Sequence, residues 1–102
     1  HVLGALAHRV AEPAGDLAVA SALASSVYDR PIAPSSVFLG EVGLGGEIRP
    51  VSQAERRLGE AAKMGISTAY MAERGIPKKA ARGIEVVAVR TVGDLFRQLF
   101  NA

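Results

Sequence analysis

Cysteine and tryptophan are absent from this chain of 102 residues, and it has only two histidines, His1 and His8. Without cysteine the chain forms neither a disulfide nor a thiolate metal site, and two histidines by themselves cannot make a structural zinc site. We therefore expect no metal or other cofactor in this chain, and we expect it to work in a reducing cytoplasm.

Long apolar runs and a strong excess of one charge are missing too. No stretch reaches the roughly 18 to 20 apolar residues of a membrane span, and no basic-then-apolar signal segment opens the chain, so we expect no membrane association. Twelve basic and ten acidic residues give a net charge of +2, which is too weak by itself to indicate nucleic-acid binding. Together with an aromatic content of 5%, this charge disfavours a stand-alone nucleic-acid-binding module.

The composition that is present is that of a small globular protein, with 49% hydrophobic and 22% charged residues. It fits one domain over residues 1–102 with a thin core, because a domain of this size buries roughly two thirds of the surface that its unfolded chain exposes. An oligomer interface would be a second source of stability.

A predicted hairpin organises the middle of the chain. Val37–Leu44 reads as one strand and Glu47–Val51 as its antiparallel partner, with Gly45 and Gly46 as a two-residue turn that has positive φ at both positions. Pro50 ends the pairing, because proline has no N–H to donate.

A helix follows this hairpin at once. Ser52 and Glu55 have the spacing of a capping box, which predicts a helix from about Gln53 to Met64. Gly65 is expected to end it in a left-handed conformation. The other patterns predict one strand, or a bent pair broken at Gly4, over residues 1–10 and a helix from 12 to about 28. They also predict strands over 67–71 and 83–89 and a last helix capped by Thr91 with Asp94. This alternation indicates a mixed α/β fold in which the hairpin makes the sheet partly antiparallel.

The glycines of the hairpin do not predict a phosphate-binding loop. Such a loop feeds directly into a helix and carries a Lys-Ser/Thr pair, whereas Ile48-Arg49-Pro50 continues as a strand here. ATP hydrolysis would have to reside outside this chain.

Two motifs carry a family resemblance: EPAGDLAVA at residues 12–20 and GEVGLGGEIRPVSQAERRLGEAAKMGI at residues 40–66. With them the chain resembles the C-terminal domain of the RadA family of bacterial DNA-repair ATPases, which is related to the proteolytic domain of Lon proteases. The resemblance implies an α/β fold, namely a two-layer mixed-sheet sandwich of the Lon proteolytic type whose first strands are missing here. The chain would thus be a C-terminal fragment of a longer protein.

For the longer protein, the resemblance implies an upstream zinc-binding segment and a RecA-like ATPase domain that uses ATP and Mg²⁺. It also implies assembly into a homo-oligomer, a hexameric ring, which acts on branched recombination intermediates by moving along single-stranded DNA.

The catalytic pair of Lon-type proteases is absent by the same resemblance. These enzymes use a serine nucleophile and a lysine base. The motifs place Ala14, after Pro13, at the serine position and Glu55 at the lysine position. Alanine offers no nucleophile, so we expect no peptidase activity; a Lon-type serine-lysine peptidase domain is the alternative function.

A basic segment is the remaining candidate site. It carries four cations with no acidic residue between them: Arg74, Lys78, Lys79 and Arg82. Solvated surface is the ordinary use of such a run, and contact with DNA phosphates is the functional alternative. Without an aromatic side chain this segment would not read base sequence. We therefore expect a non-catalytic oligomerisation scaffold with a DNA-contacting surface.

Overall fold

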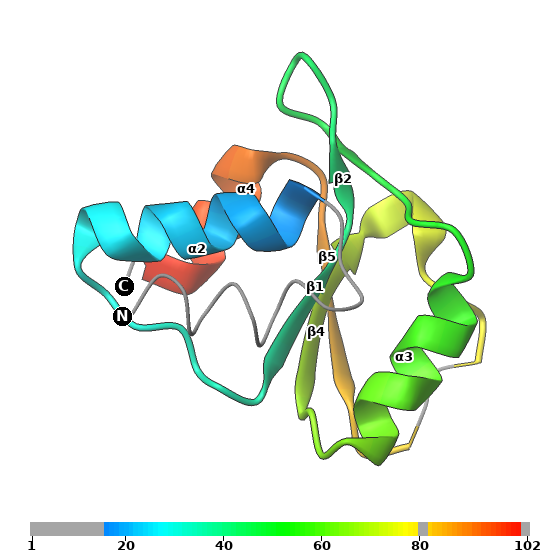
Figure 1. The fold of residues 1–102 in the computed structure, drawn as a ribbon. Coiled ribbons are helices and arrows are strands. Elements are labelled where there is room, and N and C mark those ends of the chain that lie inside the picture. The colour runs from blue at the N-terminus through cyan, green and yellow to red at the C-terminus, as the bar shows by residue number, and fades with distance from the viewer. Residues whose placement is uncertain (1–15, 80–81, 101–102) are drawn as a thin grey trace.

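A parallel three-stranded sheet lies at the centre of the computed structural model, which describes residues 16–79 and 82–100 (Figure 1). Its strands are β1 (Ser36–Leu39), β4 (Thr68–Ala72) and β5 (Glu85–Val89), in the order β1-β4-β5. Both neighbouring pairs are parallel, and Phe38 lies opposite Tyr70. The two predicted strands that became β4 and β5 are confirmed to within two residues.

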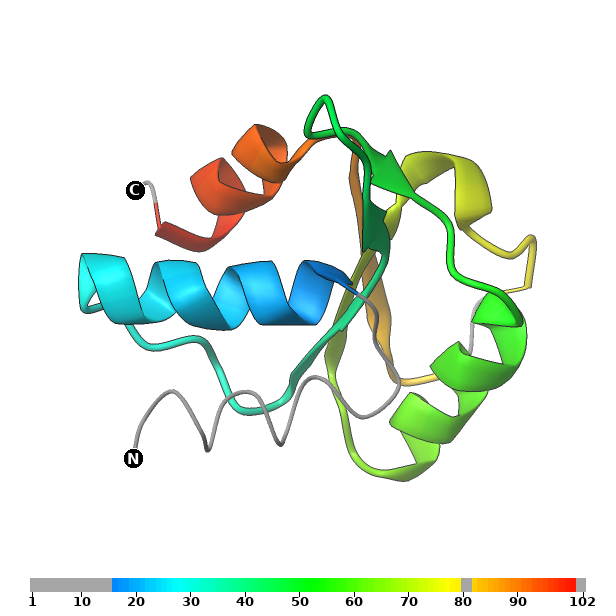
Figure 2. The same ribbon diagram turned by 45° about the horizontal axis from the view of Figure 1, so that its top comes forward.

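Helices cover both faces of this sheet. The helices α2 (Asp16–Tyr28) and α4 (Val92–Phe100) lie on one face, and α3 (Ala54–Lys63) lies on the other (Figure 2). One core cluster lies beneath α2 and α4: Leu17, Ala18, Ile32, Phe38, Ile48, Ala72, Val89 and Leu95. The other lies beneath α3: Val37, Leu39, Leu58, Ala61, Ala69, Met71 and Ile84.

These two clusters correct the expected two-layer sandwich to three layers. Successive side chains of a strand point to opposite faces, so Phe38 enters the first cluster while Val37 and Leu39 enter the second. Because β1 is buried at every position, both faces of the sheet need a helical cover. The α/β class is confirmed.

The predicted hairpin forms, but it is shorter than expected. β2 (Glu41–Val42) pairs antiparallel with β3 (Ile48–Arg49) as a separate two-stranded sheet, so the three-stranded sheet is not mixed. Backbone bonds join the two sheets: the Ile48 N–H donates to the Arg90 carbonyl at 2.8 Å. The hairpin therefore ties the beginning of β3 to the end of β5.

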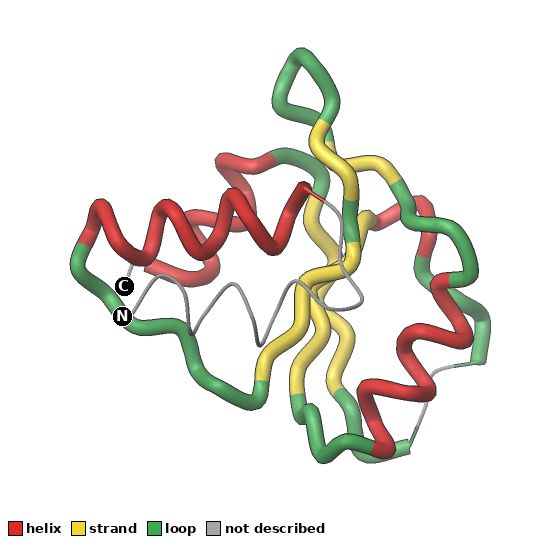
Figure 3. Tube along the Cα trace, in the orientation of Figure 1, coloured by secondary structure: helices red, strands yellow, loops and turns green. Residues whose placement is uncertain are grey.

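The turn of this hairpin has three residues between Gly43 and Glu47, not the two that were predicted. The Gly46 N–H donates to the Gly43 carbonyl at 3.0 Å, and the Gly43 N–H donates to the Glu47 carbonyl at 2.8 Å. Only Gly46 has positive φ, at 85°, so the expectation for Gly45 is wrong. This is the pattern of a turn followed by a left-handed glycine bulge. Its loop extends away from the sheet (Figure 3).

The capping box predicted for α3 is wrong. The N-cap is Gln53, in a left-handed conformation with φ 55° and ψ 43°, and no side chain caps the helix. Because α3 begins one residue later than the box requires, Glu55 is its second residue and Ser52 lies outside it. The Ser52 carbonyl instead accepts a bond from Arg57 Nε at 3.0 Å. The predicted end is confirmed, since Gly65 is left-handed and the Ile66 N–H donates to the Ala61 carbonyl at 3.0 Å.

The cap of α4 is confirmed. Thr91 Oγ1 accepts the Asp94 N–H at 3.0 Å, and Asp94 Oδ2 accepts the Arg90 N–H at 3.3 Å. Apolar residues recur at helical spacing along α4, which predicts one apolar face, and this face packs on the sheet. Leu95 lies in the core, and these residues pack against it: Val92, Phe96, Leu99 and Phe100.

Replacing Thr91 by alanine is expected to lower the free energy of unfolding by about 0.5 to 2 kcal/mol, because the Asp94 N–H loses its acceptor. Urea unfolding followed by circular dichroism measures the change. Thr91→Ser is the matched control, since it keeps the hydroxyl. Equal losses in the two variants would show that the hydroxyl does not cap the helix.

The helix α2 presents apolar residues to solvent. Val19 and Leu23 are each 50% exposed and Val27 is 80% exposed, and their spacing of four places them on one face. Because no charged residue lies between Asp16 and Asp29, the sequence predicts that this helix is enclosed on more than one side, and its exposed face shows that prediction to be wrong. Its predicted beginning near Pro13, and the predicted strand over residues 1–10, lie outside the described residues. In the part of the chain that is described, no helix has the length and apolar character needed to cross a membrane.

Candidate nucleic-acid interface

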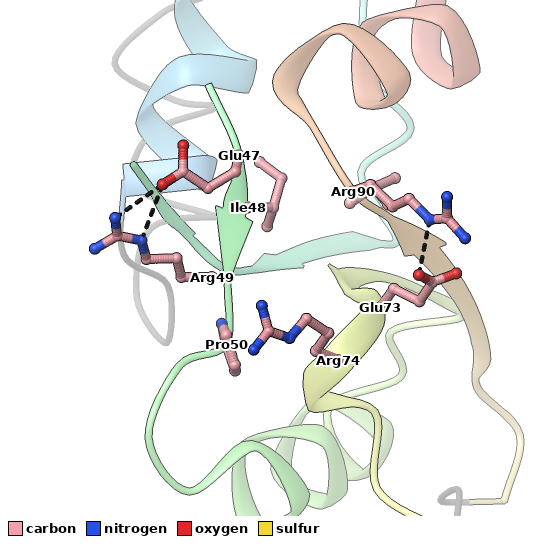
Figure 4. A pocket seen from close by; sticks show the side chains of 8 residues that line it. Glu47, Ile48, Arg49, Pro50, Glu73, Arg74 and Arg90 are labelled. Carbon is pink, nitrogen blue, oxygen red and sulfur yellow. Dashed lines mark hydrogen bonds and ion pairs between the residues drawn. The ribbon is translucent and has the colours of Figure 1, made fainter. Parts of the chain in front are cut away.

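A cavity of about 570 Å³ lies where the parallel strands end. Its lining comes from β3, from the 3₁₀ helix η1 (Glu73–Gly75) that follows β4, and from the end of β5. The lining residues are Glu47, Ile48, Arg49, Pro50, Glu73, Arg74, Val89 and Arg90 (Figure 4). The carboxyl ends of parallel strands are the usual ligand-binding edge of an open α/β sheet.

The first charged pair of the cavity is Glu47 with Arg49. Glu47 Oε2 accepts bonds from Arg49 Nη2 at 2.8 Å and Nε at 3.2 Å, and Glu47 Oε1 accepts the Gly45 N–H at 3.0 Å. A bond from its own backbone N–H, and then the Arg49 guanidinium, lower the pKa of the Glu47 carboxyl. The carboxylate is thus charged at neutral pH, and it connects the hairpin turn to the arginine of β3.

The second pair is Glu73 with Arg90. Arg90 Nε donates to Glu73 Oε1 at 2.8 Å, which joins the residue after β4 to the residue after β5. This bond raises the pKa of the Arg90 guanidinium. Both pairs are exposed and screened by solvent, so each contributes little to stability. Their main effect is to fix the positions of two guanidinium groups.

Arg74 is the third arginine of the cavity. Among the described residues it has no ion-pair or hydrogen-bond partner. Figure 4 shows its guanidinium extending from η1 toward Pro50. A guanidinium has five N–H donors in a planar arrangement that matches phosphate oxygens, so Arg74 has donors to offer a ligand.

The lining as a whole suits an anion. Three arginines and two carboxylates leave a net charge of +1. Among the described residues no serine, cysteine, histidine or lysine lines the cavity, and both of its carboxylates, Glu47 and Glu73, are paired with arginines. Within residues 16–79 and 82–100, no three His, Cys, Asp or Glu side chains lie close enough together to hold a metal ion.

The four cations of the predicted basic segment do not lie together in the structure. Arg74 lies at the carboxyl edge of the sheet, whereas Arg82 precedes β5 and lies near the opposite edge, because Thr68 and Glu85 pair there. Lys78 and Lys79 are exposed between them and do not line the cavity. Contact of Lys78, Lys79 and Arg82 with DNA stays a prediction.

Of the two positions at which the family resemblance places the protease pair, Glu55 lies among the described residues, and it does not line this cavity. Glu55 is exposed in the first turn of α3, on the other side of the sheet from α2 and α4. Ala14 lies outside the described residues. The replacement of a catalytic pair therefore stays a prediction.

Sequence reasoning missed Arg49 and Arg90 as site residues. In the sequence Arg49 belongs to a predicted strand, and Arg90 follows the VVAV run of β5. The available signal was the place of Arg90 directly after a predicted strand, at the kind of strand end where ligand-binding residues gather.

Known proteins match most of the length of this chain. No family model matches it. A protein from Streptococcus pyogenes named DNA repair protein RadA is 47% identical over 91 residues, which are 88% of this chain and 20% of that protein. Proteins of the same name from Escherichia coli and Synechocystis are 43% identical over 86 residues and 49% identical over 89 residues. These matches cover 84% and 85% of this chain, and 19% and 16% of the relatives. The chain thus spans at most about a fifth of the length of these relatives and matches their C-terminal region.

Proposed function

Because this chain belongs to the RadA family of bacterial DNA repair proteins, we propose that it is a non-catalytic domain that contacts the phosphate backbone of DNA and joins copies of a longer protein. The observation that carries the DNA contact is the cavity with Arg49, Arg74 and Arg90 at the carboxyl edge of the sheet. Arginines from three different elements line it, and two of them pair with carboxylates.

A phosphodiester is the ligand that this cavity suits. Each backbone phosphate carries one negative charge, which matches the net charge of +1 in the lining. The donors are guanidinium groups, which bind phosphate oxygens without reading the bases. The contact would therefore fix the position of DNA and leave base sequence unread.

The apolar face of α2 supports the scaffold role. Val19, Leu23 and Val27 form an exposed row with no charged side chain between Asp16 and Asp29. A surface of this kind is typical of a contact between protein chains. We propose that it contributes to a homo-oligomer, with a hexameric ring as the form that the family resemblance implies.

The remaining parts of the proposal concern the longer protein. The domain would have the Lon proteolytic fold, with Ala14 and Glu55 in place of the serine and lysine, and would cleave no peptide. The longer protein would be an ATP-dependent DNA-repair ATPase of the cytoplasm that acts in branch migration, with its zinc, ATP and Mg²⁺ sites upstream of this domain.

Replacing Arg49, Arg74 and Arg90 together by glutamine is expected to weaken binding of single-stranded DNA by roughly tenfold or more at low salt, with no change in base preference. The slope of log affinity against log salt should flatten by about one unit for each lost phosphate contact. Fluorescence anisotropy with a labelled oligonucleotide, repeated over a range of salt concentrations, measures both.

The matched control removes the same number of charges from the basic segment, by replacing Lys78, Lys79 and Arg82 with glutamine. These residues do not line the cavity, so this variant should lose less affinity. An unchanged salt slope in a correctly folded triple-arginine variant would overturn the DNA contact. Equal effects in the two triple variants would assign it to diffuse charge rather than to the cavity.

A further inference from the structure

A second cavity, of about 480 Å³, lies at the C-terminal ends of α2 and α4, which pack side by side. The described residues that line it are all aromatic or basic: Tyr28, Arg30, Phe96, Arg97 and Phe100. In Figures 1 and 2 these helix ends lie away from the sheet and from the hairpin. The two cavities share no lining residue.

Aromatic side chains gather at this cavity. Tyr28 meets Phe100 at 5.3 Å between ring centroids and Phe96 at 6.5 Å, and the two phenylalanines are 5.9 Å apart. The chain has only two tyrosines and three phenylalanines, and the other two rings, Phe38 and Tyr70, stack on each other in the sheet. The aromatic residues that the sheet does not use are therefore all in one place.

These rings are not enclosed by the protein. Tyr28 is 56% exposed, and Phe96 and Phe100 are half-buried, with one side packed against the core beneath α4. Burying an aromatic ring is strongly favourable, so three partly open rings in contact are a surface that suits a planar apolar ligand.

The arginines are held at the rim of the same cavity. Arg30 Nη1 donates to the Phe100 carbonyl, and Arg97 pairs with Asp94. Both lie at helix C-termini, where a positive charge offsets the negative end of the helix dipole and so lessens its repulsion of an anion. The Arg30 guanidinium has no further hydrogen bond or ion pair among the described residues, which leaves four of its five N–H donors for a ligand.

From these contacts we propose that this cavity binds a nucleotide, with the base stacked on Tyr28 and the two phenylalanines and the phosphate on Arg30. The volume is that of an ordinary small-ligand site. Base stacking on aromatic side chains tolerates any base, because each base has a π face. The nucleotide belongs to a single strand or is free in solution; both present the same chemistry.

This inference rests on the proposed function only in that it takes a nucleic-acid component as ligand. The arginine cavity would hold phosphates alone, whereas this cavity would hold a base together with its phosphate. An oligonucleotide without bases separates the two, because it keeps the phosphates and loses every stacking partner.

The test measures the affinity of the unaltered protein for two single strands. One is an oligothymidylate of about twelve nucleotides, and the other is an abasic oligonucleotide of the same length and charge. We expect the oligothymidylate to bind at least about fivefold more tightly. Tyr28→Ala should remove that difference, and Tyr28→Phe, which keeps the ring, should preserve it. Because the chain has no tryptophan, tyrosine fluorescence can be read directly, and stacking on Tyr28 should quench it. Quenching by thymidine monophosphate alone would identify a free nucleotide as a ligand; quenching by the oligonucleotide alone would identify a strand.

Equal affinity for the oligothymidylate and the abasic strand would overturn the inference, and it requires no variant that might unfold. The DNA contact of the arginine cavity would survive that result if Arg74→Gln still weakened both strands equally. Conversely, a clear preference for the strand with bases, together with no effect of Arg74→Gln, would support this site and count against the arginine cavity.

Discussion

Replacing Phe38 by alanine is expected to lower the free energy of unfolding by about 3 to 5 kcal/mol. That is a large share of the roughly 5 to 15 kcal/mol that stabilises a typical domain. Phe38 is 0% exposed in the middle of β1, and its ring stacks on Tyr70 of β4 at 5.1 Å between centroids. Its removal would leave a void between the sheet and the two helices on that face.

The change is measured by urea unfolding followed by circular dichroism. Leu44→Ala is the matched control, because Leu44 is 108% exposed at the hairpin tip and its truncation should change stability by less than about 0.5 kcal/mol. A loss below about 1 kcal/mol in Phe38→Ala would mean that the core beneath α2 and α4 is not packed as described.

The second large effect is expected from Gly75→Ala. An added Cβ at Gly75 would lie 2.5 Å from Pro50 Cβ and 3.3 Å from Pro50 Cα, and the proline ring cannot turn away. The contact would push η1 from the end of β3 at a cost of about 1 to 3 kcal/mol. Because Arg74 and Pro50 both line the arginine cavity, the same shift should weaken DNA binding.

The matched control is Gly59→Ala. Gly59 lies inside α3, and an added Cβ there would meet no atom within 4 Å. Alanine favours the helix over glycine, so this variant should be more stable by about 0.5 to 1 kcal/mol and should bind DNA unchanged. If Gly75→Ala behaves like Gly59→Ala, the close approach of η1 to Pro50 is wrong.

Elements with a local signal were predicted well from the sequence. The threonine hydroxyl at Thr91 and the left-handed Gly65 each act on neighbouring residues, so their effect can be read from a few letters. The capping box predicted for α3 was wrong although its residue spacing is correct. The Ser52 and Glu55 spacing fits a capping box, but the left-handed Gln53 moves the start of the helix by one residue.

The candidate site could not be predicted in the same way. Arg49 and Arg90 come together only because Ile48 bonds to the end of β5 and because β4 and β5 are in register. Neither contact has a signature in a short stretch of sequence. Arg74 could be predicted because it belongs to a run of cations in the sequence. Arg49 and Arg90, which line the same cavity, could not.

The protruding hairpin tip also makes this protein easy to label. Leu44 contributes nothing to the core, and the chain contains no thiol. Leu44→Cys would therefore introduce a unique attachment point for a dye or spin label. It would lie on the hairpin that carries Glu47 and Arg49, so a probe there would report on ligands that enter the arginine cavity without altering its lining.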